Sequence, residues 1–193
     1  ASGRLFNGDE LLYVLAKDRM DRGQTIGGVV GTLMTNLAVE NAIKGLGIGF
    51  ERANVGDRYV LELLKQKGWI IGGEGSGHLL CLDQHSTGDG TIAALQVLAA
   101  MSQTKKSLAQ LLDSVKIFPQ VLLNIKFKAG YDWKSDASLK SKISQVESDL
   151  KGTGRVLIRA SGTEPVLRVM VEAQDGSLAM SSAKSIADLV PTS

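Results

Sequence analysis

The first 116 positions of the chain alternate between two hydrophobic patterns. Apolar residues three or four positions apart predict helices, over residues 9–22, 36–45, 57–67, 91–101 and 107–115. Short apolar or glycine-bounded runs predict strands between them, over residues 27–31, 48–52, 69–71 and 79–82. Strands that alternate with helices, with glycine at the junctions, are typical of an α/β domain, and we expect one with a mixed sheet.

Short polar residues stand where several of these predicted helices begin. Asp9, Asn36 and Asp57 each come before an apolar-periodic stretch, and their side-chain oxygens suit the free backbone N–H groups of a first turn. We therefore expect all three residues to be N-caps. The nine residues up to Asp9 are interpreted as a turn and the last strand of a hairpin, which suggests that the chain is part of a longer polypeptide.

The pattern changes near Pro119. Residues 121–128 alternate as a partly exposed strand, a polar stretch follows with one helix from about Ser138, and two further strands are predicted over residues 155–158 and 166–172 before a helix over 177–190. This order predicts a small α+β domain with its helices on one face of a sheet. We expect two domains, residues 1–116 and residues 117–193.

The amino-acid composition excludes several classes of protein. With 44% hydrophobic and 22% charged residues, the chain is expected to fold into a globular protein. Its net charge is only +2 and its aromatic content 5%, so it lacks the basic, aromatic-rich stripe that is typical of nucleic-acid-binding proteins. The single cysteine, Cys81, cannot build a disulfide framework. No apolar run approaches the length of a membrane span, and no signal peptide opens the chain. The sequence therefore predicts a cytoplasmic protein with no nucleic-acid or membrane partner.

A loop over residues 72–78 is unusually rich in glycine, which lets a backbone approach a ligand closely. Glu74 and Ser76 alternate with glycines, and His78 follows. A carboxylate accepts hydrogen bonds from neighbouring hydroxyls and a serine hydroxyl donates or accepts, so this set suits a sugar. A flexible turn with a satisfied histidine is an equally good interpretation from spacing alone.

A second loop lies between the two later strands of the C-terminal domain. Ser161 and Thr163 supply hydroxyls, Gly162 exposes a backbone N–H, and Arg159 and Arg168 flank them with guanidinium groups that fork onto phosphate oxygens. The alternative is a serine-threonine turn beside two surface arginines. We favour the phosphate site, because an arginine beside an apolar run is costly without an anionic partner.

Weaker candidates lie elsewhere. Arg58 follows Asp57 at a predicted helix start, where the helix dipole disfavours a cation, and it is a secondary candidate for an anionic substrate. Asp89 stands in a Thr-Gly-Asp-Gly sequence without a second carboxylate, so we interpret it as a turn and helix cap rather than a metal ligand. The sequence contains no P-loop and no Gly-x-Ser-x-Gly elbow.

Four motifs occur in one order along the chain. They are Val-Gly-Asp-Arg-Tyr-Val at residues 55–60, Gly-Glu-Gly-Ser-Gly-His at 73–78, Ser-Thr-Gly-Asp-Gly at 86–90 and Arg-Ala-Ser-Gly-Thr-Glu-Pro-Val-Leu-Arg-Val-Met at 159–170. Over essentially its whole length the chain resembles the α-D-phosphohexomutase family. That family has four domains, and this chain resembles the third and fourth.

The resemblance implies roles for the loops. In the family the first glycine-rich loop holds sugar hydroxyls, which points to Glu74 and Ser76 with His78 nearby, and the Gly-Asp-Arg-Tyr loop lies beside the sugar, which makes Asp57 and Arg58 secondary. The Arg-x-Ser-Gly-Thr loop grips the substrate phosphate. That implies phosphate-binding roles for Arg159, Ser161, Gly162, Thr163 and Arg168.

The resemblance also implies a reaction. It is the isomerisation of glucosamine 6-phosphate to glucosamine 1-phosphate, toward cell-wall precursors, through a phosphoserine and a bisphosphorylated sugar. The family's nucleophilic serine and its Mg²⁺-binding Asp-Gly-Asp-Gly-Asp-Arg loop lie in the first two domains, and neither motif occurs in this chain. We therefore expect no catalytic or metal residue here, and we expect a missing N-terminal half to supply both.

Two alternatives remain open at this point. The residues of the Gly-Asp-Arg-Tyr and Ser-Gly-Thr-Glu-Pro motifs favour glucosamine as the sugar. The same family, however, includes phosphomannomutases and phosphoglucomutases. The two domains are also compatible with a free-standing, non-catalytic phosphosugar-binding module.

Overall fold

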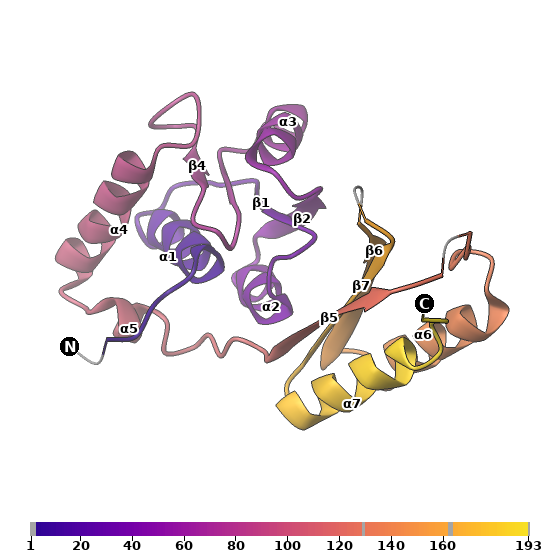
Figure 1. The fold of residues 1–193 in the computed structure, drawn as a ribbon. Coiled ribbons are helices and arrows are strands. Elements are labelled where there is room, and N and C mark those ends of the chain that lie inside the picture. Colours follow the sequence, from indigo (N-terminus) through magenta and orange to yellow (C-terminus); the bar gives the residue numbers. More distant parts are fainter. Residues whose placement is uncertain (1–2, 129, 162–163, 193) are drawn as a thin grey trace. The chain divides into compact units, whose positions relative to one another are not determined.

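The computed structural model describes residues 3–128, 130–161 and 164–192. These residues form two compact units, residues 1–117 and residues 118–193 (Figure 1). Within the described residues no helix is both long enough and apolar enough to cross a membrane.

The N-terminal unit is a mixed α/β fold, which confirms the predicted class. Its elements are α1 (Gly8–Asp21), β1 (Gly28–Thr32), α2 (Leu37–Gly45), β2 (Gly49–Ala53), α3 (Asp57–Lys67), β3 (Ile71–Gly73), β4 (Leu79–Cys81), α4 (Gly90–Thr104) and α5 (Leu108–Leu111). The sheet order is β2-β1-β3-β4. Strand β1 runs parallel to β2 and β3, and β4 pairs with β3 in the antiparallel sense.

Helices cover both faces of this sheet. On one face α1, α2 and α4 bury the larger apolar cluster, which includes Leu12, Leu15, Ile43 and Val97. On the other face α3 packs Val60 and Leu64 against the sheet (Figure 1). A βαβ order with helices on both faces leaves the loops at the strand ends as the places where polar side chains gather.

The helix starts differ in part from the predicted caps. Asn36 caps α2 as predicted, but α1 is capped by Asn7 in a capping box with Glu10. Asp9 lies inside the first turn of α1, only 4% exposed, where its Oδ2 accepts a hydrogen bond from the Asn36 N–H at 2.9 Å. The predicted cap at Asp9 is wrong, because Asn7, two residues earlier, accepts the Glu10 N–H and begins the helix. Residues 3–7 form no strand.

The predicted strand over residues 69–71 begins only at Ile71, and Trp69 instead packs as a ring against glycine backbone. A Cβ at Gly28 would lie 2.4 Å from three atoms of the Trp69 ring, and one at Gly27 would lie 2.9 Å from the indole nitrogen. The indole therefore occupies the space that side chains at these two positions would need. Glycine at the start of β1 is required by packing rather than by backbone dihedral angles.

The C-terminal unit is a three-stranded antiparallel sheet with two helices, as predicted. Its elements are β5 (Gln120–Lys126), α6 (Ala137–Asp149), β6 (Gly154–Ala160), β7 (Val166–Ala173) and α7 (Gly176–Ala187), and the strand order is β5-β7-β6. Alternate residues such as Leu167, Val169 and Val171 pack against α6 and α7 on one face (Figure 1).

The other set of alternating residues in this sheet includes polar side chains as well as apolar ones such as Met170. Glu172 is fully buried, and its carboxylate accepts hydrogen bonds from Arg155 Nε at 2.7 Å and from Gln120 Nε2 at 2.7 Å. These two donors lie directly opposite Glu172 on the neighbouring strands β6 and β5. The buried charge is therefore satisfied by its own cross-strand neighbours.

The contact between Trp69 and glycine generates a stability prediction. We expect Gly28→Ala to destabilise the N-terminal unit by about 1–3 kcal/mol, because its methyl group overpacks against the indole. Urea unfolding measures this effect. Tryptophan fluorescence in a Trp133→Phe background reports on the N-terminal unit alone, since the chain has two tryptophans.

Gly45→Ala is the control, because a Cβ at this helical position meets nothing within 4 Å. It should be neutral or slightly stabilising. A Gly28→Ala variant that unfolds at the same urea concentration as the wild type would contradict the packing described here.

Candidate functional site

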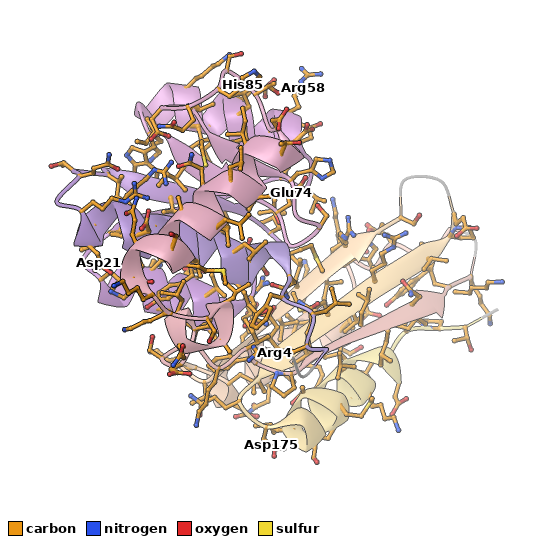
Figure 2. All side chains as sticks on the ribbon, turned by 90° about the vertical axis from the view of Figure 1, so that its left-hand side faces the viewer. Arg4, Asp21, Arg58, Glu74, His85 and Asp175 are labelled. Atoms are coloured by element: carbon orange, nitrogen blue, oxygen red, sulfur yellow. The ribbon has the colours of Figure 1, made fainter. Side chains whose placement is uncertain are left out.

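The loop between β3 and β4 forms a tight turn with Glu74 at its start. The Glu74 N–H donates to the His78 carbonyl at 3.0 Å, and the Gly77 N–H donates to the Glu74 carbonyl at 2.9 Å. Gly77 has φ +99°, a conformation that favours glycine. Figure 2 shows Glu74 on this loop, and its side chain is half-buried. The glycine density of the motif therefore serves a compact turn that fixes the backbone of Glu74.

Two of the predicted loops meet at the Glu74 carboxylate. Its Oε2 accepts a hydrogen bond from the Gly56 N–H at 2.9 Å, and Gly56 is the N-cap residue of α3. The sequence separates these residues by 18 positions. Sequence reasoning missed the contribution of Gly56, because a backbone N–H leaves no signature in a residue pattern.

Ser76 and His78 lie together on the exposed side of the same turn. The Ser76 hydroxyl is 3.2 Å from His78 Nδ1, within hydrogen-bonding distance. A hollow of about 290 Å³ opens here, lined by Ser76, Gly77, His78, Leu79, Gly88, Asp89 and Gly90. Asp89 caps α4 through a hydrogen bond from the Ile92 N–H, as the sequence predicts. The motif over residues 86–90 thus forms one wall of the hollow, a role that its sequence did not indicate.

The structure corrects the predicted cap at Asp57 and shows an ion-pair partner for Arg58. Asp57 is the first residue of α3 and not its N-cap, and its Oδ1 accepts a hydrogen bond from the Arg58 N–H at 2.8 Å. Arg58 Nε lies 2.8 Å from Glu62 Oε1, one turn along the same helix, and Arg58 extends outward in Figure 2. The hydrogen bond from Arg58 to Glu62 raises the pKa of the arginine. Glu62 thus already offsets the unfavourable position of this cation at a helix start.

In the C-terminal unit, strand register places the two predicted arginines directly opposite each other. Arg159 on β6 faces Arg168 on β7, and Asn124 on β5 faces Arg168 from the other side. Neither arginine has an acidic partner among the residues that the structure describes. The Arg168 Nε atom is buried and, within that part of the chain, has no hydrogen-bond partner.

A hydrogen bond joins the residue after β6 to the start of β7. The Ser161 N–H donates to the Val166 carbonyl at 2.8 Å, so Ser161 lies at the same end of the sheet as the arginine pair. Gly162 and Thr163, which the sequence also assigns to the phosphate site, lie outside the described residues.

The residues present do not fit a metal site. Within the described ranges there is no group of three or more His, Cys, Asp or Glu side chains that could hold an ion. Magnesium therefore has no identified ligands among the residues that the structure describes.

Family models match both units of the chain. Residues 7–118 match the family model described as phosphoglucomutase/phosphomannomutase, alpha/beta/alpha domain III, and residues 122–189 match that of the phosphoglucomutase/phosphomannomutase C-terminal domain. The chain is 82% identical over 192 residues to the phosphoglucosamine mutase of Polynucleobacter asymbioticus, and 61% identical over 186 residues to that of Ralstonia pickettii.

The chain was also compared with these relatives in length and with solved structures in fold. The chain is covered fully by the first relative and to 96% by the second, but it spans only 43% and 42% of their own lengths. Among solved structures, N-acetylphosphoglucosamine mutase of Aspergillus fumigatus has the same fold, with a TM-score of 0.77 and 23% identity over 96% of this chain and 47% of that one. The chain belongs to the phosphoglucomutase/phosphomannomutase family, of which it carries the third and the C-terminal domain.

Proposed function

We propose that this chain is the substrate-binding C-terminal part of a phosphosugar mutase that interconverts glucosamine 6-phosphate and glucosamine 1-phosphate. In this proposal the loop with Glu74, Ser76 and His78 binds sugar hydroxyls. Arg159, Ser161, Gly162, Thr163 and Arg168 bind a phosphate group. Asp57 and Arg58 stay secondary candidates beside the sugar, and the Arg58 side chain is exposed next to Glu62.

The opposed arginine pair is the observation that carries the proposal. Like charges directly opposite on neighbouring strands repel each other, and a buried guanidinium nitrogen without an acceptor costs free energy. A phosphate dianion removes both penalties, because each guanidinium forks onto its oxygens. Since Arg159 and Arg168 have no acidic partner among the described residues, a bound anion is the simplest way to satisfy them.

The sugar assignment has a second source of support. The Glu74 carboxylate is half-buried with one oxygen engaged by the Gly56 N–H, and Ser76 and His78 of the same loop line an open hollow. Carboxylates are the natural acceptors for paired sugar hydroxyls. The preference for glucosamine rests on the relatives at 82% and 61% identity, which are phosphoglucosamine mutases.

The proposed reaction needs residues outside this chain. A phosphoserine there transfers its phosphoryl group to the free hydroxyl of the sugar phosphate, which gives a bisphosphorylated sugar and a serine hydroxyl. After the intermediate has turned round, the serine takes the other phosphoryl group back. The residues of this chain bind and orient both states, and positioning of this kind supplies much of the rate in phosphoryl transfer.

The two loops predict separable binding defects. In the full-length polypeptide, Arg159→Ala should weaken the binding of both glucosamine 6-phosphate and inorganic phosphate by about tenfold or more, since hydrogen bonds to charged groups contribute about 1.5–3 kcal/mol. Glu74→Ala should weaken only the sugar phosphate to a similar degree. Isothermal titration calorimetry with both ligands measures this difference.

A matched control is Lys151→Ala, an exposed cation that precedes the same strand β6. It should leave both affinities unchanged. Equal losses of phosphate affinity in the Glu74→Ala and Arg159→Ala variants would count against two distinct subsites.

The arginine pair also predicts how phosphate affects stability. Without phosphate, Arg168→Met should be as stable as the wild type or more stable by up to about 1 kcal/mol, because it removes a cross-strand repulsion. Phosphate should raise the melting temperature of the wild type and not of the variant, since a ligand that binds only the native state stabilises it.

Arg155→Met, four residues before Arg159 on the same strand, is the contrasting control. It leaves the buried Glu172 without its cation and should cost about 2 kcal/mol or more whether or not phosphate is present. If Arg168→Met is destabilising to the same extent as Arg155→Met in phosphate-free buffer, Arg168 already has a partner of its own and the proposed phosphate site loses its main support.

A further inference from the structure

The Glu74 carboxylate is held from outside its own loop. Its Oε2 accepts the Gly56 N–H at 2.9 Å, and the loop backbone is held separately, because the Gly8 N–H donates to the Gly75 carbonyl at 2.9 Å. A Cβ at Gly8 would lie only 1.9 Å from the Glu74 carbonyl oxygen. Gly8 thus holds the backbone of the loop, and Gly56 holds the carboxylate of Glu74.

Gly56 has a backbone conformation that other residues rarely adopt. Its φ is +128° and its ψ is +132°, and a Cβ added there would lie 3.3 Å from Tyr59 Cδ2. This conformation directs the N–H toward Glu74 at the start of α3. Gly56 has no side chain with which to cap α3, and the Glu74 carboxylate accepts the N–H of this N-cap residue. The positive end of the helix dipole favours a negative charge there.

From these contacts we propose that Gly56 is a positioning residue for Glu74, and that its N–H fixes one carboxylate oxygen so that the other is presented to a sugar hydroxyl. The inference rests on the proposed function, because it assigns the geometry of the same sugar site. It gives the first half of the Val-Gly-Asp-Arg-Tyr motif a role that does not depend on the side chains of Asp57 and Arg58.

A substitution at Gly56 changes the N–H direction without removing any side chain. Alanine at φ +128° is strained, so the backbone has to rotate and the hydrogen bond to Glu74 is lost. Gly68→Ala is the matched control, because Gly68 ends the same helix, also has a positive φ of +67°, and would place its Cβ in open space. Both variants introduce strain into α3, but only Gly56→Ala alters the orientation of Glu74.

The test is steady-state kinetics of the full-length polypeptide with glucosamine 6-phosphate. Gly56→Ala should raise KM by roughly tenfold, in proportion to the loss of one hydrogen bond to a charged group. Gly68→Ala should leave KM within about twofold, a change that corresponds to well under one hydrogen bond. In a Glu74→Ala background Gly56→Ala should cause no further rise, because two residues that act through one interaction are not additive.

A second variant tests the orientation independently of folding at residue 56. In Glu74→Gln the single carbonyl oxygen is required by the Gly56 N–H, so the amide NH₂ faces the sugar and donates where an acceptor is needed. Its KM should therefore approach that of Glu74→Ala. A Glu74→Gln variant with a KM within about threefold of the wild type would overturn the inference, since that change is less than a hydrogen bond contributes.

The positioning role of Gly56 and the proposed function of the chain can be refuted separately. Equal KM values for Gly56→Ala and Gly68→Ala, with an active wild type, refute the role of Gly56 and leave the proposed function intact. A wild-type polypeptide without activity on glucosamine 6-phosphate would overturn the proposed function, and the positioning role of Gly56 would fall with it.

Discussion

Close approach to glycine backbone is the constraint on which the N-terminal unit depends. The Trp69 ring lies where a Cβ of Gly28 would be, and the Glu74 carbonyl oxygen lies where a Cβ of Gly8 would be. The first contact joins a sheet strand to the aromatic ring that precedes β3, and the second joins the start of α1 to the β3–β4 loop. Because protein interiors are close-packed, neither contact leaves room for a larger residue. The same residue type thus supports both the core and the candidate site.

The C-terminal unit handles charge in two contrasting ways within one sheet. Glu172 is buried, but Arg155 and Gln120 satisfy it from the two neighbouring strands. In a nearby row of the same sheet, Arg159 and Arg168 face each other with no acidic partner among the described residues. The sheet thus neutralises Glu172 with two cross-strand donors but leaves Arg159 and Arg168 opposed. This contrast fits a role for the arginine pair in binding an external anion.

The two units also differ in how their candidate residues are held. Glu74 is fixed by backbone donors from outside its loop, which costs little conformational freedom when a ligand arrives. The arginines depend instead on strand register, which fixes their Cα positions but leaves long side chains to be ordered by the ligand. The first arrangement suits the recognition of stereochemistry. The second suits the capture of a charged group that every substrate of the class carries.

Much of this protein was determined by its sequence alone, because periodicity and turn chemistry are local. The α/β pattern before Pro119, the strand, helix, strand, strand and helix order after it, and the loops around Glu74 and Ser161 were all predicted from residues close in the chain. Asn36 and Asp89 were predicted correctly as caps for the same reason, while Asp9 and Asp57 were not, since neighbouring residues compete for the cap position.

Tertiary structure alone decided which distant groups meet. The hydrogen bond from the Gly56 N–H to Glu74 depends on how α3 packs beside β3. Arg159 lies opposite Arg168 only in the observed strand register, and a shift of one residue would separate them. The exposed ion pair between Arg58 and Glu62 lies within one helix, and the structure places it at the start of α3. Local patterns specify elements and their faces. The pairing of groups across elements is set by packing and register, which act between residues far apart in the sequence.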